Sequence, residues 1–351
     1  MIELHCSKCF TGVALALAGL LLFAVTGCAA PPLTATPGTT RTLNPDLLGA
    51  NANLTAFDRP WEHSELMTAF REMGVGNLRY PAGTLGNYWD WDIGWVDQSV
   101  PDSLMIKWVV ENNLRDLPAR YTLENLALVV RETGVVPVFM LNMLSKDLDH
   151  SLRNLRRAHD LGIPIRYVEL GNELYFDIPF PKLRFATPEA YGDTCQAWIT
   201  VLEEEFPTAE FAVVGTDMTR HARQRNWTRR VLEHCDKADA VTFHKYAPSG
   251  LDGRRAKKYL RPGNEGTSDP VTETRTGPET VVERQGWERE LLAEPAAYAN
   301  LLTNAAESAA GWRHYGIPEG MDVWATEFNM RDDSSVVLHG WAHGLLLSTY
   351  F

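Results

Sequence analysis

Short apolar runs alternate with longer amphipathic stretches along most of the chain. The apolar runs are rich in β-branched and aromatic residues, which favours strands; they lie at 47–51, 77–80, 135–141, 165–170, 210–215, 239–244 and 321–327. Between them, apolar residues recur with the 3.6-residue period of helices, most clearly at 62–73, 122–133, 149–161, 188–205, 226–236 and 296–314. The pattern therefore predicts a repeated strand–helix unit.

The junctions between these elements support the same reading. Several predicted helices end in a glycine and re-enter an apolar run within a few residues, as in RETGVVPVF at 131–139 and HDLGIPIRYV at 159–168. Glycine is favoured just past a helix because it adopts the left-handed backbone found there. Repeated βα units with buried strands predict a (β/α)8 barrel. A doubly wound sheet is the alternative, but no glycine-rich phosphate loop follows the first strand.

The first residues have the pattern of an export signal rather than of a folded domain. Lys8 precedes an apolar run at 13–25 that is too short for an ordinary membrane span, and VTGC follows at 25–28. This tetrapeptide resembles a bacterial lipobox, in which the cysteine becomes the lipidated first residue. We therefore predict a lipoprotein signal peptide at 1–27, with Cys28 carrying lipid and anchoring an exported, membrane-attached protein.

The rest of the chain divides into a tether and one large domain. Residues 28–44 are rich in Pro and Thr and read as a linker, and the predicted barrel occupies 45–351. After the seventh predicted strand only one helix-like run, HGWAHGLLLSTYF, remains before Phe351. We therefore expect the barrel to be incomplete here and its eighth βα unit to lie in a continuation of the chain.

Composition limits the partners. The formal net charge of −12 disfavours general affinity for nucleic acid or acidic membranes, which rests on positive surfaces. The only membrane attachment expected is the N-terminal lipid. In an oxidising compartment, Cys195 and Cys235 on neighbouring predicted helices either form a disulfide or remain two buried thiols.

Two predicted strands end on a carboxylate. Glu173 follows the strand at 165–170 in YVELGNELYF, and Glu327 ends the strand at 321–327 in VWATEFNM. Barrel active sites lie where the strands end, at the C-terminal face. A lone glutamate at such a position is usually a solvated loop residue, but two of them facing each other across a barrel mouth suit retaining glycoside hydrolysis. That reaction uses two carboxyl groups about 5–5.5 Å apart.

These contexts resemble a known group of enzymes. Gly171-Asn172-Glu173 and Thr326-Glu327-Phe328-Asn329 are similar to the clan A glycoside hydrolases, which are retaining (β/α)8 enzymes. Together with LRYPAGT at 78–84, they look closest to the α-L-arabinofuranosidase and heparanase-like β-glucuronidase groups. The resemblance implies a glycosidase acting on poly- or oligosaccharides, with Glu173 as acid/base and Glu327 as nucleophile.

The resemblance also implies roles for neighbouring residues. Asn172 matches an asparagine that binds the sugar 2-hydroxyl, and Arg79 matches an arginine that keeps the nucleophile ionised. His244 and Tyr246, after the sixth strand, match residues beside the nucleophile. The alternatives are an ordinary ion pair for Arg79 and a structural histidine for His244.

Further candidates rest on position alone. Asn51 and Asn142 follow the first and third strands and are placed to bind sugar hydroxyls. Trp89 and Trp91 lie in NYWDW at 87–91, where flat rings suit a sugar face; the alternative is a hydrophobic plug under a loop.

Other functional classes are less well supported. The histidines are scattered without the HxH or HExxH spacing of metal sites, so no metal and no cofactor are predicted. A non-catalytic glycan-binding lipoprotein on a barrel scaffold remains the alternative to an enzyme.

Overall fold

The computed structural model describes residues 49–52, 61–97, 99–100, 121–248 and 315–331. The chain divides into two compact units, Met1–Asn44 and Pro45–Phe351, and the described residues all belong to the second. The predicted signal peptide, the lipidated Cys28, the tether and the helix at 296–314 lie outside the described residues, so these remain predictions.

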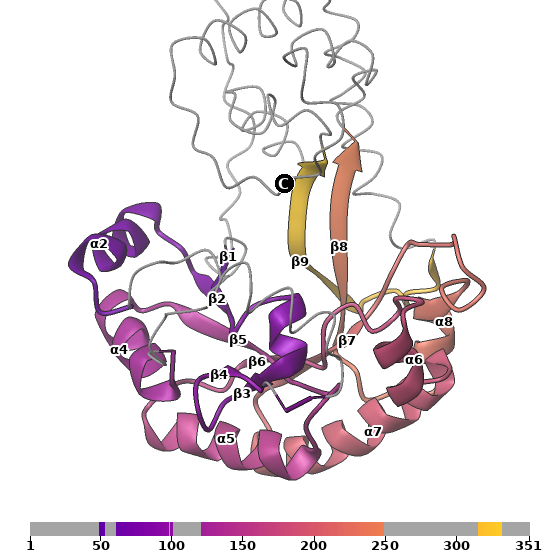
Figure 1. Ribbon diagram of the computed structural model, residues 1–351, viewed down its shortest axis with the longest axis horizontal. Helices are drawn as coiled ribbons and strands as arrows, with labels where there is room; N and C mark the ends of the chain where they lie inside the picture. The colour runs from indigo at the N-terminus through magenta and orange to yellow at the C-terminus, as the bar shows by residue number, and fades with distance from the viewer. Residues whose placement is uncertain (1–48, 53–60, 98, 101–120, 249–314, 332–351) are drawn as a thin grey trace, which may run out of the picture. The chain divides into compact units, whose positions relative to one another are not determined.

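Seven parallel strands form a nearly closed, barrel-shaped sheet (Figure 1). Each strand pairs in parallel with its neighbours in the order β1-β2-β5-β6-β7-β8-β9. The bounds are β1 Gly49–Asn51, β2 Asn77–Tyr80, β5 Val136–Met140, β6 Tyr167–Glu169, β7 Glu210–Val214, β8 Ala240–Pro248 and β9 Asp322–Arg331. All seven predicted strands are present, and the predicted (β/α)8 class is confirmed for these units. The expected eighth unit remains a prediction.

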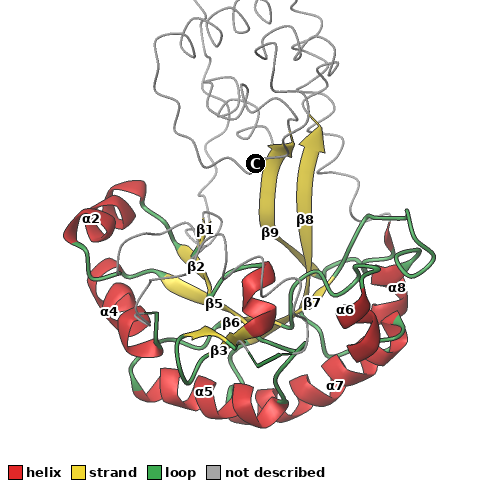
Figure 2. Cartoon of the chain, in the orientation of Figure 1, coloured by secondary structure: helices red, strands yellow, loops and turns green. Residues whose placement is uncertain are grey.

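Helices cover the outside of the sheet (Figure 2). They are α2 Ser64–Met73, α4 Leu123–Thr133, α5 Leu148–Asp160, α7 Pro188–Glu205 and α8 Trp227–Leu232. Each matches a predicted helix, although α8 is shorter than the predicted 226–236. The sequence pattern did not predict a 3-10 turn at Thr84–Tyr88, the small hairpin of β3 Trp89–Asp90 and β4 Trp95–Val96, or α6 Pro179–Arg184. All of these lie in connections that follow strands.

The glycines at the helix ends act as the sequence pattern suggested. Gly74 and Gly134 close α2 and α4 in the left-handed conformation, with φ of 61° and 75°, which costs a glycine little. At the N-terminus of α7, the Thr187 side chain accepts a hydrogen bond from the backbone N–H of Ala190, and Pro188 occupies the first turn. These caps fix where α2 and α4 end and where α7 begins.

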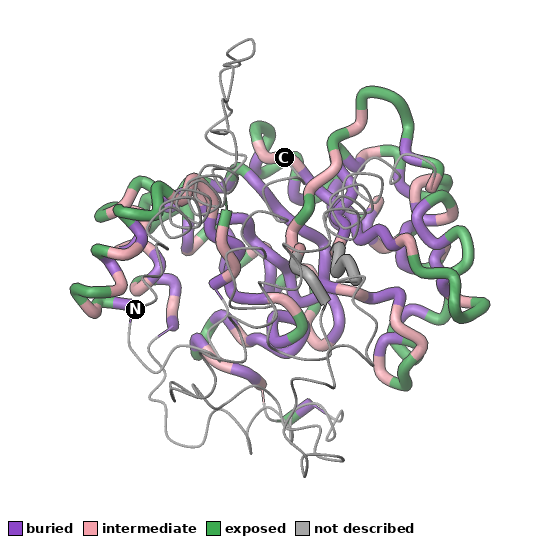
Figure 3. Tube along the Cα trace, turned by 90° about the horizontal axis from the view of Figure 1, so that it is seen from above, coloured by how far each residue is buried: buried purple, intermediate pink, exposed green. Residues whose placement is uncertain are grey.

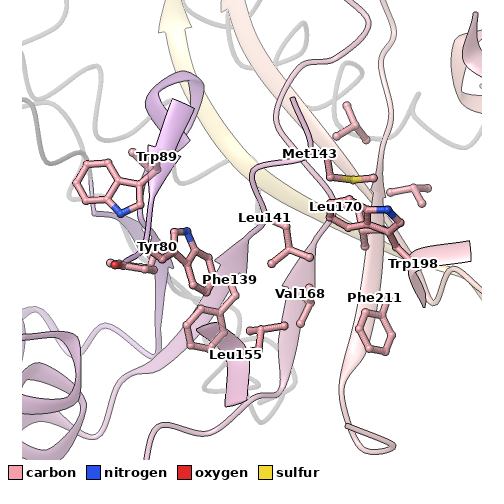
Figure 4. Close-up of a cluster of buried hydrophobic side chains, with 14 of the residues drawn as sticks. Tyr80, Trp89, Phe139, Leu141, Met143, Leu155, Val168, Leu170, Trp198 and Phe211 are labelled. Atoms are coloured by element: carbon pink, nitrogen blue, oxygen red, sulfur yellow. The ribbon is translucent and has the colours of Figure 1, made fainter. Parts of the chain in front are cut away.

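The strands are buried on both faces, as expected for a parallel sheet under helices. Figure 3 shows buried chain at the centre and exposed chain on the outer rim. Phe139, Val168 and Phe211 come from three successive strands and pack in one cluster with helix residues such as Leu155 (Figure 4). Cys195 and Cys235 are both buried and free, so the structure favours two thiols. No helix in the described ranges has both the length and the apolarity to cross a membrane.

Candidate functional site

The site is organised around one buried guanidinium. The side chain of Arg79, on β2, is 4% exposed, and that of Glu169, on β6, is 0% exposed. Arg79 Nε donates to Glu169 Oε2 at 2.6 Å, and Nη2 donates to Glu169 Oε1 at 2.9 Å. Nη2 also donates to Asn172 Oδ1 at 2.7 Å. Nη1 donates to Glu327 Oε1 at 2.7 Å and to Asn51 Oδ1 at 3.2 Å. An arginine offers five N–H donors, and these contacts match that capacity.

The two predicted catalytic carboxylates meet beside His244. His244 Nδ1 lies 2.9 Å from Glu173 Oε1 and 3.6 Å from Glu327 Oε2. One side-chain oxygen of each glutamate and one ring nitrogen of His244 all lie within 4.8 Å of one another. The structure therefore brings Glu173, which follows β6, and Glu327, on β9, to one place beside His244.

The backbone after β6 holds Glu173 in an uncommon conformation. Its φ is 48°, in the left-handed region, and Gly171 just before it has φ of 89°. A non-glycine residue rarely adopts positive φ, and such residues cluster at functional sites. The turn ends the strand abruptly and directs Glu173 toward His244 rather than along the strand.

A register irregularity in β9 brings two consecutive side chains into the site. Phe243 pairs with Ala325, but His244 pairs with Glu327, so Thr326 is the extra residue of a bulge. Successive residues of a regular strand point to opposite faces, and a bulge re-aims one of them. Here Thr326 Oγ1 lies 3.2 Å from His244 Nε2 while Glu327 accepts from Arg79. The bulge thus places both residues beside His244.

Asn172 has a buried side-chain NH2 group without a partner among the described residues. Its Oδ1 accepts from Arg79, and its backbone is fixed on both sides by the Asn87 side chain: Asn172 N donates to Asn87 Oδ1 at 3.1 Å and Asn87 Nδ2 donates to Asn172 O at 2.8 Å. Among the described residues, the buried Nδ2 of Asn172 has no hydrogen-bond partner. A buried unsatisfied donor is costly, so this nitrogen is suited to a ligand acceptor.

Tyr175 supports Glu173 through a hydrogen bond from its hydroxyl group. Its hydroxyl donates to Glu173 Oε1 at 3.0 Å. Burial, together with the negative charge of Glu173, raises the pKa of Tyr175 well above its usual value. The hydroxyl therefore remains protonated and keeps donating to the carboxylate.

The charged side chains of the site differ in how deeply they are buried. Arg79 and Glu169 are almost fully buried, whereas the side chains of Glu173 and Glu327 are 14% and 17% exposed. Burial disfavours the charge on Arg79, but Glu169 and then Glu327 more than offset that effect and raise the Arg79 pKa. Arg79 is therefore a permanent, buried cation near two carboxylates that are partly exposed to solvent.

Gly83 leaves space for this arrangement. A Cβ at Gly83 would collide with Glu327 Oε1 and press on Arg79 Nη1 and Asn172 Oδ1. The loop after β2 can therefore approach the carboxylates only where the side chain is a hydrogen atom.

Most of the predicted site residues converge, but not all of them contact the carboxylates. Asn51 joins the network, since its Nδ2 also donates to the Thr326 carbonyl at 2.9 Å. Asn142 instead braces loops: its amide bonds the Trp89 carbonyl and both the N–H and the hydroxyl of Ser145. The side chain of Tyr246 lies outside the described residues.

The two predicted platform tryptophans lie in the core. Trp89 and Trp91 are 1% and 2% exposed, and both rings pack edge-on against Tyr80. Their apolar area is more favourably buried than left in a wet loop, so they do not offer a ring face to a sugar. The structure favours the hydrophobic-plug alternative, and Figure 4 shows Trp89 beside Tyr80.

Some residues of the site were not predicted. Glu169, Tyr175 and Asn87 all contact predicted residues, yet none was singled out from the sequence. Glu169 carried a signal, because a carboxylate inside the apolar run YVEL needs a buried cationic partner. The other two gave none, since their roles depend on how the loops fold.

Among the residues that the structure describes, two groups of side chains have spacing compatible with a metal ion. One is Glu173, His244 and Glu327; the other is Asp90, Asp92 and His150. In the first, the Arg79 cation already donates to Glu327, and in the second Lys146 Nζ lies 2.8 Å from Asp90 Oδ2 and Arg153 Nη2 2.7 Å from Asp92 Oδ2. The protein thus supplies its own cations to both groups.

Comparison with solved structures identifies the class of fold. The arabinofuranosidase of glycoside hydrolase family 51 from Xanthomonas axonopodis pv. citri aligns with a TM-score of 0.55 at 12% identity, covering 87% of this chain and 63% of that one. A family 51 α-L-arabinofuranosidase from Bifidobacterium longum aligns with a TM-score of 0.51 at 15% identity, covering 83% and 57%. The described part of the chain therefore shares the barrel fold of these two arabinofuranosidases.

Other comparisons add less. A 4-O-α-L-rhamnosyl-β-D-glucuronidase from Fusarium oxysporum aligns at 13% identity with a TM-score of 0.46, covering 88% of this chain and 60% of that one. No protein-family model matches the chain, and no curated protein does. The chain spans 51% to 63% of the length of the arabinofuranosidase structures it matches.

Proposed function

We propose that this protein is a retaining glycoside hydrolase that cleaves poly- or oligosaccharides through a glycosyl-enzyme intermediate. The observation that carries the proposal is the meeting of Glu173 and Glu327, whose nearest carboxylate oxygens lie within 4.8 Å, on a glycosidase fold. Retaining enzymes need one carboxylate to attack the anomeric carbon and a second, close by, to move the proton.

Glu327 is the proposed nucleophile. Arg79 donates to its Oε1 at 2.7 Å, and a neighbouring guanidinium favours the ionised form of a carboxylate. In the first step Glu327 forms a bond to the anomeric carbon as the bond to the leaving oxygen breaks. In the second step water displaces Glu327, which leaves as a carboxylate.

Glu173 is the proposed acid/base. Tyr175 and His244 both contact its Oε1, so we assign Oε2 as the oxygen that carries the proton. That proton passes to the leaving oxygen in the first step. The same oxygen takes a proton from the attacking water in the second step.

Asn172 is the proposed sugar-binding donor. Its orientation is fixed because Oδ1 is engaged by Arg79, which leaves the buried Nδ2 without a partner among the described residues. A sugar hydroxyl oxygen next to the anomeric carbon would satisfy this donor. The carboxamide can only donate in this orientation, so the substrate must present an acceptor.

The experiment replaces each carboxylate by its amide and measures hydrolysis of aryl glycosides. We expect Glu327→Gln and Glu173→Gln to lower kcat by at least about 10³-fold, since each removes a reacting group. A 2-fluoro glycoside should label the wild-type protein on Glu327, as read by peptide mass spectrometry. As a folding control, Glu189→Gln alters a carboxylate on the outer helices and should keep wild-type activity. Hydrolysis that persists in both amide variants contradicts the proposal.

We further propose that the enzyme works outside the cytoplasm, attached by lipid on Cys28. The support is the sequence alone: a short apolar run followed by Val25-Thr26-Gly27-Cys28. Acylation supplies membrane affinity in proportion to the buried methylene groups. Cys28→Ser should move the protein from the membrane fraction to the soluble fraction, and an unchanged distribution contradicts the anchor.

A further inference from the structure

Glu169 is a third carboxylate beneath the two that the proposed reaction uses. It belongs to β6, four residues before Glu173, and its side chain is fully buried. Its two oxygens accept from Nε and Nη2 of Arg79. A glutamate at this depth is expensive unless a cation and hydrogen bonds compensate it, which suggests a specific task.

The contacts of Arg79 show how this task is divided. Nε and Nη2 hold Glu169, while Nη1 is directed at Glu327 and Nη2 also reaches Asn172. A guanidinium is planar, so fixing one edge fixes the directions of all its N–H groups. Glu169 therefore determines where Arg79 places the donors that contact the nucleophile and the sugar-binding asparagine.

Charge gives Glu169 a second effect. Arg79 carries one positive charge and lies between two carboxylates, of which Glu169 contributes more than Glu327 to raising the Arg79 pKa against the opposing effect of burial. Glu169 therefore balances more of the positive charge of Arg79 than Glu327 does. Glu327 therefore interacts with a cation whose positive charge is already partly balanced by Glu169.

A second contact ties Glu169 to the strand that carries the nucleophile. Thr326 is the residue just before Glu327, and its Oγ1 donates to Glu169 Oε1 at 3.3 Å. The other side of the same hydroxyl faces His244 Nε2. Glu169 is therefore connected to the nucleophile's neighbourhood both through Arg79 and through the β9 bulge.

We propose that Glu169 is a positioning residue that orients Arg79 and balances its charge, so that Glu327 remains an effective nucleophile. This inference rests on the proposed function for its catalytic meaning. The coupling between Glu169 and Glu327 is a property of the folded chain and can be measured without any substrate.

The test compares Glu169→Gln with Glu169→Asp. The first variant removes the charge and keeps the length; the second keeps the charge and shortens the reach. Without the Glu169 charge, the positive charge of Arg79 acts more strongly on Glu327, so the acid limb of the kcat/KM profile should move to lower pH. We also expect kcat to fall by about 10-fold or more with a small change in KM. Glu169→Asp should lower kcat but leave the acid limb in place.

Two readouts separate this inference from the proposed function. Hydrolysis of an aryl glycoside across pH reports the acid limb, and carboxyl ¹³C NMR, with Glu327→Gln used for assignment, reports the Glu327 titration directly. Glu189→Gln, which disrupts an Arg–Glu pair on the outer helices, is the matched control and should shift neither.

The outcomes are distinct. Active wild type with an unshifted limb and an unshifted Glu327 titration in Glu169→Gln overturns the inference and leaves the function standing. Inactive wild type with a shifted titration does the reverse. If Glu169→Gln does not fold, Glu169→Asp decides: a lower kcat with the wild-type acid limb supports the inference, while wild-type kcat or a displaced limb overturns it.

Discussion

Two arginine–glutamate pairs in this protein have nearly the same geometry and very different surroundings. Between the outer helices α7 and α8, Arg230 binds Glu189 with Nε–Oε1 of 2.5 Å and Nη2–Oε2 of 2.8 Å, and each side chain is 31% exposed. Inside the barrel, Arg79 binds Glu169 at 2.6 and 2.9 Å, with exposures of 4% and 0%. Both are two-pronged contacts, so geometry alone does not distinguish them.

The difference lies in what each pair can do for its neighbours. The outer pair is closed on itself and faces water, so it joins two helices and contributes modestly to stability. The inner pair has N–H groups left over, and these reach Glu327, Asn172 and Asn51. Burial makes the inner pair costly to form, and its surplus donors give it a role in the site.

The largest expected effect comes from removing the inner cation. Arg79→Met leaves Glu169 and Glu327 without their cation, and we expect a loss of about 3–5 kcal/mol in the free energy of unfolding at neutral pH. Urea denaturation followed by fluorescence measures it. The double variant Arg79→Met/Glu169→Leu should recover part of the loss, because it also removes the uncompensated buried carboxylate. A loss below about 1 kcal/mol in the single variant would contradict this expectation, because the inner pair would then contribute no more than an ordinary surface pair.

The smallest expected effect comes from the outer pair. Glu189→Gln should cost about 1 kcal/mol or less at neutral pH, and that cost should shrink in high salt because the pair is screened. The hydrogen bond from Arg230 lowers the pKa of Glu189 from 4.5 to about 2. A depressed pKa stabilises the folded state above pH 4.5 and loses this contribution as the pH falls toward 2.

Urea titrations of wild type and Glu189→Gln at neutral pH and at about pH 3 check the sign of this effect. The difference between the two proteins should narrow at the lower pH. A difference that grows on acidification would contradict the assignment of Arg230 as the cause.

The sequence predicted the parts of this fold that depend on local pattern. The apolar runs and their glycine-terminated helices predicted the seven strands and five of the helices, and the strand ends located Glu173 and Glu327. Position at a strand end is a local property of the chain, and this is why these two residues could be found, whereas Arg79 was implied by the family resemblance.

What the sequence did not predict depends on long-range geometry. Glu169 was not singled out, because a strand buried on both faces does not show which side chains point inward. The β9 bulge at Thr326 shifts the strand pairing by one residue. No residue type in WATEFNM predicts a bulge at this position. Trp89 and Trp91 were misplaced because a polar neighbourhood in sequence does not exclude burial of the rings.

The hydrogen bond from Asn51 to the Thr326 carbonyl joins residues 275 positions apart in the chain. The first strand of the sheet is therefore in contact with the last one, and Arg79 reaches Glu327 over a separation of 248 positions. Contacts of such long range form late, because the intervening loop must be closed first. The proposed site is therefore incomplete until β9 joins the sheet, because Glu327 comes from β9 while Asn51 and Arg79 come from β1 and β2.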